Sequence, residues 1–142
     1  MNIRPPTPAD YDRVADLAGQ LGYPCTGAQI RARLAEMEDP NRYAVFVAEL
    51  PEGRIAGWIG VHLFRAIELD CRAEITGLIV DQEIRSRGIG QALLAAAEDW
   101  ARNQGCGAIA VQSNVMRDGA HRFYERRGFQ HVKTQKSFCK TL

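Results

Sequence analysis

The chain has no large excess of charge of either sign, and this first limits its function. Eighteen lysines and arginines stand against 17 aspartates and glutamates, which gives a formal net charge of +1. A field that attracts nucleic acid or an anionic membrane requires a marked basic excess. We therefore expect no nucleic acid and no membrane among its partners, and any basic site must be local.

Closely spaced cysteines and long apolar runs are also missing. No cysteine belongs to a C-x-x-C pair or lies at a metal-ligand spacing from a histidine, so no metal site is predicted. No apolar run approaches the roughly 18 residues that cross a bilayer. The residues after Met1 do not resemble a signal peptide, and we expect a cytoplasmic protein. The cysteines, expected to be reduced thiols, are Cys25, Cys71, Cys106 and Cys139.

The composition is that of an ordinary globular protein. Of the 142 residues, 46% are hydrophobic and 25% are charged, which is enough apolar material for a substantial core. No internal repeat, linker or low-complexity tract interrupts the chain. The sequence therefore predicts a single domain over residues 1–142.

Hydrophobic periodicity and capping residues predict an alternation of strands and helices. Thr7 with Asp10, and Thr26 with Gln29, have the spacing of capping boxes at helix starts. The expected strands are 3–4, 43–50, 55–64, 71–80, 109–112, 129–132 and 135–139, and the expected helices are 7–21, 26–37, 89–105 and 120–127.

A glycine-containing loop joins a buried strand to the longest helix. The strand ends at 78–80, which is apolar on both faces, and the loop is Arg85-Ser86-Arg87-Gly88-Ile89-Gly90. The first turn of a helix presents backbone N–H groups without partners, and glycines allow a phosphate to approach them. The loop is thus a candidate diphosphate site. A helix start with ordinary glycine turns and solvated arginines is the alternative, whereas the P-loop and dinucleotide patterns do not match.

Two motifs together resemble the GNAT (GCN5-related N-acetyltransferase) superfamily. One is Arg85-x-x-Gly88-x-Gly90 after the buried strand. The other is Asn114 followed by a segment from Ala120 to Phe129 that contains Phe-Tyr and Gly-Phe. The resemblance covers nearly the whole chain. It implies the acyl-CoA N-acyltransferase fold, an α/β (α+β) three-layer architecture with a mixed central sheet of about six to seven strands and four helices.

The resemblance also implies acetyl-CoA as cosubstrate. The strand ending at Val80 and the strand starting near Ile109 would splay apart around the pantetheine arm. Asn114 would face this arm. The main chain of Leu78, Ile79 and Val80 would hydrogen-bond the pantetheine and the thioester carbonyl. The residues expected around the diphosphate are Arg85, Ser86, Arg87, Gly88, Ile89, Gly90 and Gln91.

Acetyl transfer to an amine requires a base, because a protonated amine has no lone pair. Glu74 is the candidate, and strict alternation along its strand would place it on the same face as Leu78 and Val80. A water relay, or an ion-paired Glu74, is the alternative. The resemblance assigns Tyr124 as the acid that protonates the departing thiolate, although its ring can also serve as a packing anchor. An acetyl-enzyme is not expected.

The predicted function is N-acetyltransfer from acetyl-CoA directly to a primary amine of a small molecule. Alternatives are acetylation of a protein N-terminus or lysine, and a non-catalytic acyl-CoA-binding module. The acceptor pocket is expected near 21–37 and 131–137, which carry no readable signature. Similar proteins often dimerise, so a homodimer is an expected state. Acidic residues that would favour a cationic acceptor, unless they are only solvated surface, are Glu36, Glu38, Asp39, Glu68 and Asp70.

Overall fold

The computed structural model describes residues 1–84 and 87–142. The chain forms two compact units, Met1–Val111 and Gln112–Leu142. Each unit is described by itself. In the part of the chain that the structure describes, no helix is long and apolar enough to cross a membrane.

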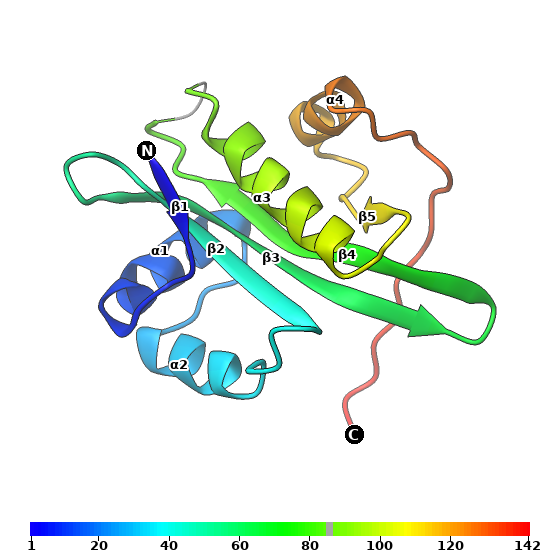
Figure 1. Cartoon of the computed structure of the whole chain (residues 1–142), viewed down its shortest axis with the longest axis horizontal. Helices are drawn as coiled ribbons and strands as arrows, with labels where there is room; N and C mark the ends of the chain where they lie inside the picture. The colour runs from blue at the N-terminus through cyan, green and yellow to red at the C-terminus, as the bar shows by residue number, and fades with distance from the viewer. Residues whose placement is uncertain (85–86) are drawn as a thin grey trace. The chain divides into compact units, whose positions relative to one another are not determined.

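A five-stranded sheet is the centre of the first unit (Figure 1). Its strands follow chain order across the sheet, and every neighbouring pair is antiparallel except β4 and β5, which are parallel. The mixed α/β architecture is therefore confirmed. The strands are β1 (Asn2–Arg4), β2 (Tyr43–Glu49), β3 (Ile55–Ala66), β4 (Leu69–Val80) and β5 (Ile109–Val111).

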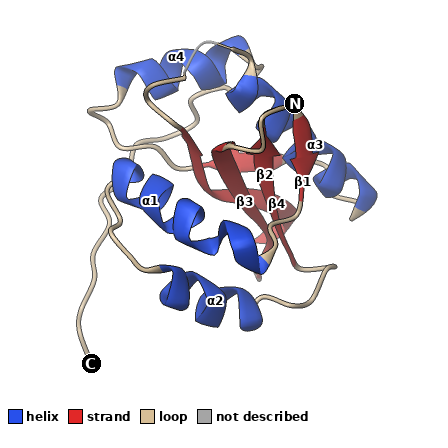
Figure 2. Ribbon diagram, turned by 90° about the vertical axis from the view of Figure 1, so that its left-hand side faces the viewer, coloured by secondary structure: helices blue, strands red, loops and turns tan. Residues whose placement is uncertain are grey.

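Helices cover both faces of this sheet, so the unit has three layers (Figure 2). On one face lie α1 (Tyr11–Leu21), which follows the 3-10 turn η1 (Pro8–Asp10), and α2 (Gly27–Ala35). The other face is covered by α3 (Ile89–Asn103), which contacts β2, β3 and β4. The core on the α1 side is formed by Val14, Leu17, Val47, Ile55 and Ile79, with Leu21, Ile30 and Trp58 packed against it.

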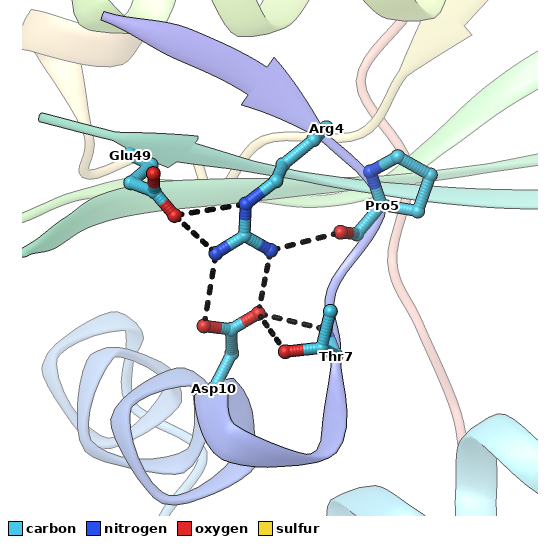
Figure 3. Close-up of polar contacts among 5 residues, drawn as sticks. All are labelled: Arg4, Pro5, Thr7, Asp10 and Glu49. Carbon is cyan, nitrogen blue, oxygen red and sulfur yellow. Dashed lines mark hydrogen bonds and ion pairs between the residues drawn. The ribbon is translucent and has the colours of Figure 1, made fainter. Parts of the chain in front are cut away.

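A polar cluster fixes the start of the first helical segment against the sheet (Figure 3). Arg4 donates to both oxygens of Asp10, at 2.7 and 3.2 Å, and also to Glu49 and to the carbonyl oxygen of Pro5. Asp10 in turn accepts the backbone N–H of Thr7 at 2.7 Å, as the predicted capping box requires. The Arg4 guanidinium, helped by this N–H, holds the pKa of the buried Asp10 carboxyl below its ordinary value.

The strand β4 contains one more residue than its partner β3 across a short interval. Gly77 pairs with Gly60, whereas Ile75 pairs with the next residue of β3, Val61. Thr76 therefore has no partner in the register and forms a β-bulge. Because side chains alternate between faces, an extra residue exchanges the faces of all side chains on one side of it.

The second unit contains the helix α4 (Asp118–Arg126) and an extended chain after it. The expected strands 129–132 and 135–139 are wrong: within 129–142, all of which the structure describes, no strand is formed. Residues 130–142 are exposed, and a short two-stranded hairpin with no face to bury is marginally stable in water. The sheet consequently has five strands among the described residues, fewer than the six or seven expected.

Candidate functional site

The start of α3 follows the loop that the sequence identifies as a phosphate site. Gly88 is the N-cap residue, with a left-handed φ of +74°, and a Cβ added there would meet no atom of the described residues within 4 Å. Its carbonyl oxygen accepts the first helical hydrogen bond, from the N–H of Ala92 at 3.0 Å. Arg87 is exposed beside it, whereas Arg85 and Ser86 lie outside the described residues. A helix N-terminus such as this one, whose first residues are Ile89, Gly90 and Gln91, suits an anionic ligand such as a diphosphate.

A buried carboxylate anchors the chain just before this loop. The side chain of Asp81 is 1% exposed and pairs with Arg13 of α1 and with Arg54, the latter at 2.8 Å. It also accepts the N–H of Glu83 at 3.0 Å, and its carbonyl oxygen accepts the N–H of Ile84. The N–H of Glu83 and the guanidinium of Arg13 lower the pKa of Asp81 to about 2, although burial acts in the opposite direction.

Sequence reasoning did not identify Asp81 as a site residue. The available signal was a carboxylate directly after an apolar strand end, but its arginine partners are 27 and 68 residues away in the chain.

The two parallel strands share hydrogen bonds over a short interval only. The ladder between β4 and β5 has three pairs: Ala73 with Ile109, Glu74 with Ala110, and Ile75 with Val111. Leu78, Ile79 and Val80 lie beyond the end of this ladder, while on the other side of β4 they pair with β3. The pantetheine arm is expected beyond the end of this ladder, and its contacts with 78–80 stay a prediction.

The bulge changes the orientation of Glu74. Because Glu74 pairs with His62, it faces the same side as Ile79, which packs against α1. The expectation that Glu74 shares a face with Leu78 and Val80 is therefore wrong: these two point to the α3 side. Strict alternation failed because it assumed that no residue is bulged between Glu74 and Leu78.

Glu74 is held by an ion pair on its own strand. Its Oε1 accepts hydrogen bonds from Nη2 of Arg72 at 2.9 Å and from Nε at 3.3 Å. The Glu74 side chain is 18% exposed. His62, opposite Glu74 on β3, stacks on Tyr43 with ring centroids 6.4 Å apart. The ion-paired alternative is thus present, and both hydrogen bonds from Arg72 are accepted by the same carboxylate oxygen.

A cavity of about 270 Å³ opens on this same face of the sheet, between α1, α2 and the strands β3 and β4. We call it the α1–α2 cavity. Residues within the expected 21–37 segment contribute to it, whereas the acidic residues proposed to favour a cationic acceptor are exposed elsewhere. The contributions of β3 and β4 were missed, and the lining residue from β4, Thr76, is the bulged one. The lining residues are Ala18, Leu21, Tyr23, Cys25, Arg33, Trp58 and Thr76.

Tyr124 and Asn114 both belong to the second unit. The Tyr124 ring makes edge-to-face contacts with Phe123 and Phe129, at centroid distances of 5.3 Å each. Burial raises the pKa of Tyr124, so the phenol is protonated at neutral pH. Asn114 accepts the N–H of Met116 with its side-chain oxygen at 2.9 Å and lies three residues beyond the end of β5. Its contact with a pantetheine arm stays a prediction.

Comparison with known proteins agrees with this architecture. The model of the acetyltransferase (GNAT) family matches residues 13–129. An aminoalkylphosphonate N-acetyltransferase of Salmonella typhimurium is 35% identical over 97 residues, which are 68% of this chain and 62% of that protein. The chain thus spans less than two thirds of that relative. An aminoglycoside N(6')-acetyltransferase of Stenotrophomonas maltophilia is 30% identical over 92% of this chain and 87% of its own length.

Solved structures share the fold at low sequence identity. An aminoglycoside 6'-N-acetyltransferase from Acinetobacter haemolyticus superposes with a TM-score of 0.84 at 19% identity, over 100% of this chain and 99% of its own. The family model matches far more than half of the chain, and it includes both motifs from which the resemblance was drawn. The chain therefore belongs to the acetyltransferase (GNAT) family.

Proposed function

We propose that the chain transfers the acetyl group of acetyl-CoA directly to a primary amine of a small molecule. The observation that carries the proposal is the order of three features along the chain. The ladder of β4 with β5 ends at Ile75, an anchored turn follows at Asp81, and α3 then starts with a glycine, Gly88, as its N-cap. Together they offer an extended main chain for an amide-containing arm and a helix N-terminus for its diphosphate. The relatives named above, which are small-molecule N-acetyltransferases, support the same reaction class.

When bound, acetyl-CoA would supply an activated thioester. The first turn of α3 and Arg87 would hold its diphosphate, and 78–80 would orient the arm along β4. We assign Glu74 the role of accepting the ammonium proton, directly or through a water molecule, because it faces the side of the α1–α2 cavity. We assign Tyr124 the role of general acid toward the departing thiolate, because its phenol is protonated at neutral pH.

The proposal is tested by incubating the protein with acetyl-CoA and a panel of small amines while measuring release of free thiol. In the same assay, Glu74→Gln is expected to lower kcat/KM for the amine about tenfold at pH 7, because water replaces the carboxylate as a less effective base. The deficit should shrink as the pH approaches the pKa of the amine. Thiol release only with peptides would instead favour a protein acetyltransferase, and acetyl-CoA binding with no acceptor would favour a non-catalytic module.

Gly88→Val is expected to weaken acetyl-CoA binding about tenfold or more, measured by calorimetry. A β-branched residue at φ +74° costs about 1–2 kcal/mol of backbone strain, and its side chain would stand at the N-terminus of α3, where the diphosphate is proposed to bind. Gly53→Val is the matched control, because Gly53 also has a positive φ, +89°, and open space, but lies in the turn between β2 and β3. Equal dissociation constants for the two variants would refute the diphosphate assignment.

A further inference from the structure

The α1–α2 cavity is built around a fixed aromatic floor. The indole Nε1 of Trp58 donates to the carbonyl oxygen of Val14 at 3.2 Å, which ties the ring to α1. The ring lies across Gly77, where an added Cβ would come within 2.9 Å of it. Thr76, the bulged residue, places its hydroxyl over Gly60. The floor therefore combines an apolar surface with one hydroxyl group at the β4 end.

Arg33 is the one charged residue among the seven that line this cavity. It lies in the last turn of α2, is exposed, and has no ion pair or side-chain hydrogen bond within the described ranges 1–84 and 87–142. Its neighbour Arg31 differs, since that guanidinium stacks over the Tyr11 ring at 5.6 Å. The end of a helix favours a cation, but this explains only the charge, not its place on a cavity wall beside Trp58.

The arrangement of charges discriminates between classes of acceptor. A guanidinium forms paired hydrogen bonds with a carboxylate, phosphate or phosphonate, and it repels a polycation. No carboxylate lines the cavity, so a polyamine or aminoglycoside would find no partner for its additional ammonium groups. Glu74 lies two residues before Thr76 and faces the same side of the sheet, so the β4 end suits the reactive amine.

The volume is compatible with a small acceptor. At about 270 Å³ the cavity lies at the lower end of the range for drug-sized ligands, roughly 300–1,000 Å³. An aliphatic chain of a few carbons over the Trp58 ring fits this space and separates the two polar ends.

We propose that the acceptor is a short amine with an anionic group at its other end, and that Arg33 binds this group while the amine points toward Thr76 and Glu74. This inference rests on the proposed function, because it takes the ligand of the α1–α2 cavity to be the acetyl acceptor. Arg33 is then the residue that determines specificity among amines. A carboxylate and a phosphonate share the required chemistry, and the test compares them.

The test measures thiol release with β-alanine, 2-aminoethylphosphonate, propylamine and spermidine. We expect kcat/KM for at least one of the two anionic amines to exceed that for propylamine at least tenfold. Arg33→Gln should lower kcat/KM for that amine about 10- to 100-fold, without changing kcat/KM for propylamine or KM for acetyl-CoA. Arg33→Lys should recover part of the loss. Arg31→Gln is the matched control and should change nothing.

Two results would overturn the inference while leaving the proposed function intact: equal use of propylamine or spermidine by the unmodified protein, or an equal loss for propylamine in Arg33→Gln. In the opposite case the ligand class is right and the proposed function is wrong. Calorimetry with the two anionic amines, in the presence of coenzyme A, identifies this case. Binding that disappears in Arg33→Gln, with no thiol release from any amine, would support the ligand class and contradict the acetyltransferase. Absence of both binding and thiol release would contradict the two proposals together.

Discussion

Asp81→Asn is expected to lower the free energy of unfolding by about 2–3 kcal/mol at pH 7. The substitution keeps the shape of the side chain but removes the charge that faces Arg13 and Arg54 in a nearly inaccessible position. A pKa lowered from 3.8 to about 2 corresponds by itself to roughly 2 kcal/mol at neutral pH. The measurement is urea unfolding of both proteins, followed by circular dichroism.

The pH dependence distinguishes lost charge from lost packing. Because the folded-state pKa of Asp81 is depressed, its contribution is complete above about pH 4 and disappears as the pH falls through about 2. The difference between the unmodified protein and Asp81→Asn should therefore shrink from pH 6 to pH 2.5. A constant difference would assign the loss to packing. Asp99→Asn, which removes an exposed pair with Arg102 on α3, is the control and should cost at most about 0.5 kcal/mol.

Tyr124→Phe is expected to reduce kcat about 100-fold or more. The phenylalanine ring can keep the edge-to-face contacts with Phe123 and Phe129, so the second unit should remain folded. What disappears is the hydroxyl group, which has no hydrogen-bond partner among residues 1–84 and 87–142 and is therefore not needed for packing. The measurement is steady-state turnover together with the dissociation constant of coenzyme A, which should change less than about twofold.

Tyr11→Phe provides the matched comparison for this experiment. It removes the same hydroxyl oxygen from a tyrosine of α1, whose ring packs under the guanidinium of Arg31 of α2. We expect its kcat to equal that of the unmodified protein. If Tyr124→Phe also turned over normally, Tyr124 would be a packing residue only, and another proton donor would have to be sought.

Local signals in the sequence were sufficient for most of the first unit. Thr26 and Gln29 form the predicted reciprocal hydrogen bonds, at 3.2 and 3.0 Å, because a capping box depends on residues three apart. The helix α1 ends at Gly22, whose left-handed φ of +106° suits glycine. The strands β2, β3 and β4 appear within a few residues of their expected bounds, since each is a long apolar run next to turn residues.

Features that depend on distant partners were not predictable in this way. The bulge at Thr76 arises from the register between β3 and β4, and no property of Thr76 itself indicates that it is bulged. The expected strands after α4 contain suitable residues, but a strand also requires a partner edge, which a single sequence does not specify. Arg33 looks like any solvated helix arginine until Trp58 and Tyr23 are seen to line the same cavity.

The bulge at Thr76 divides one strand between two tasks. Side chains before it, such as Arg72 and Glu74, project toward the face that α1 covers, while the segment from Leu78 onward leads into the turn at Asp81 and the helix start that follows. Under the proposed function, we expect substitutions in the earlier half to adjust the choice of amine without disturbing the later half. Under that proposal, the acceptor side can diversify during evolution while the donor side stays constant.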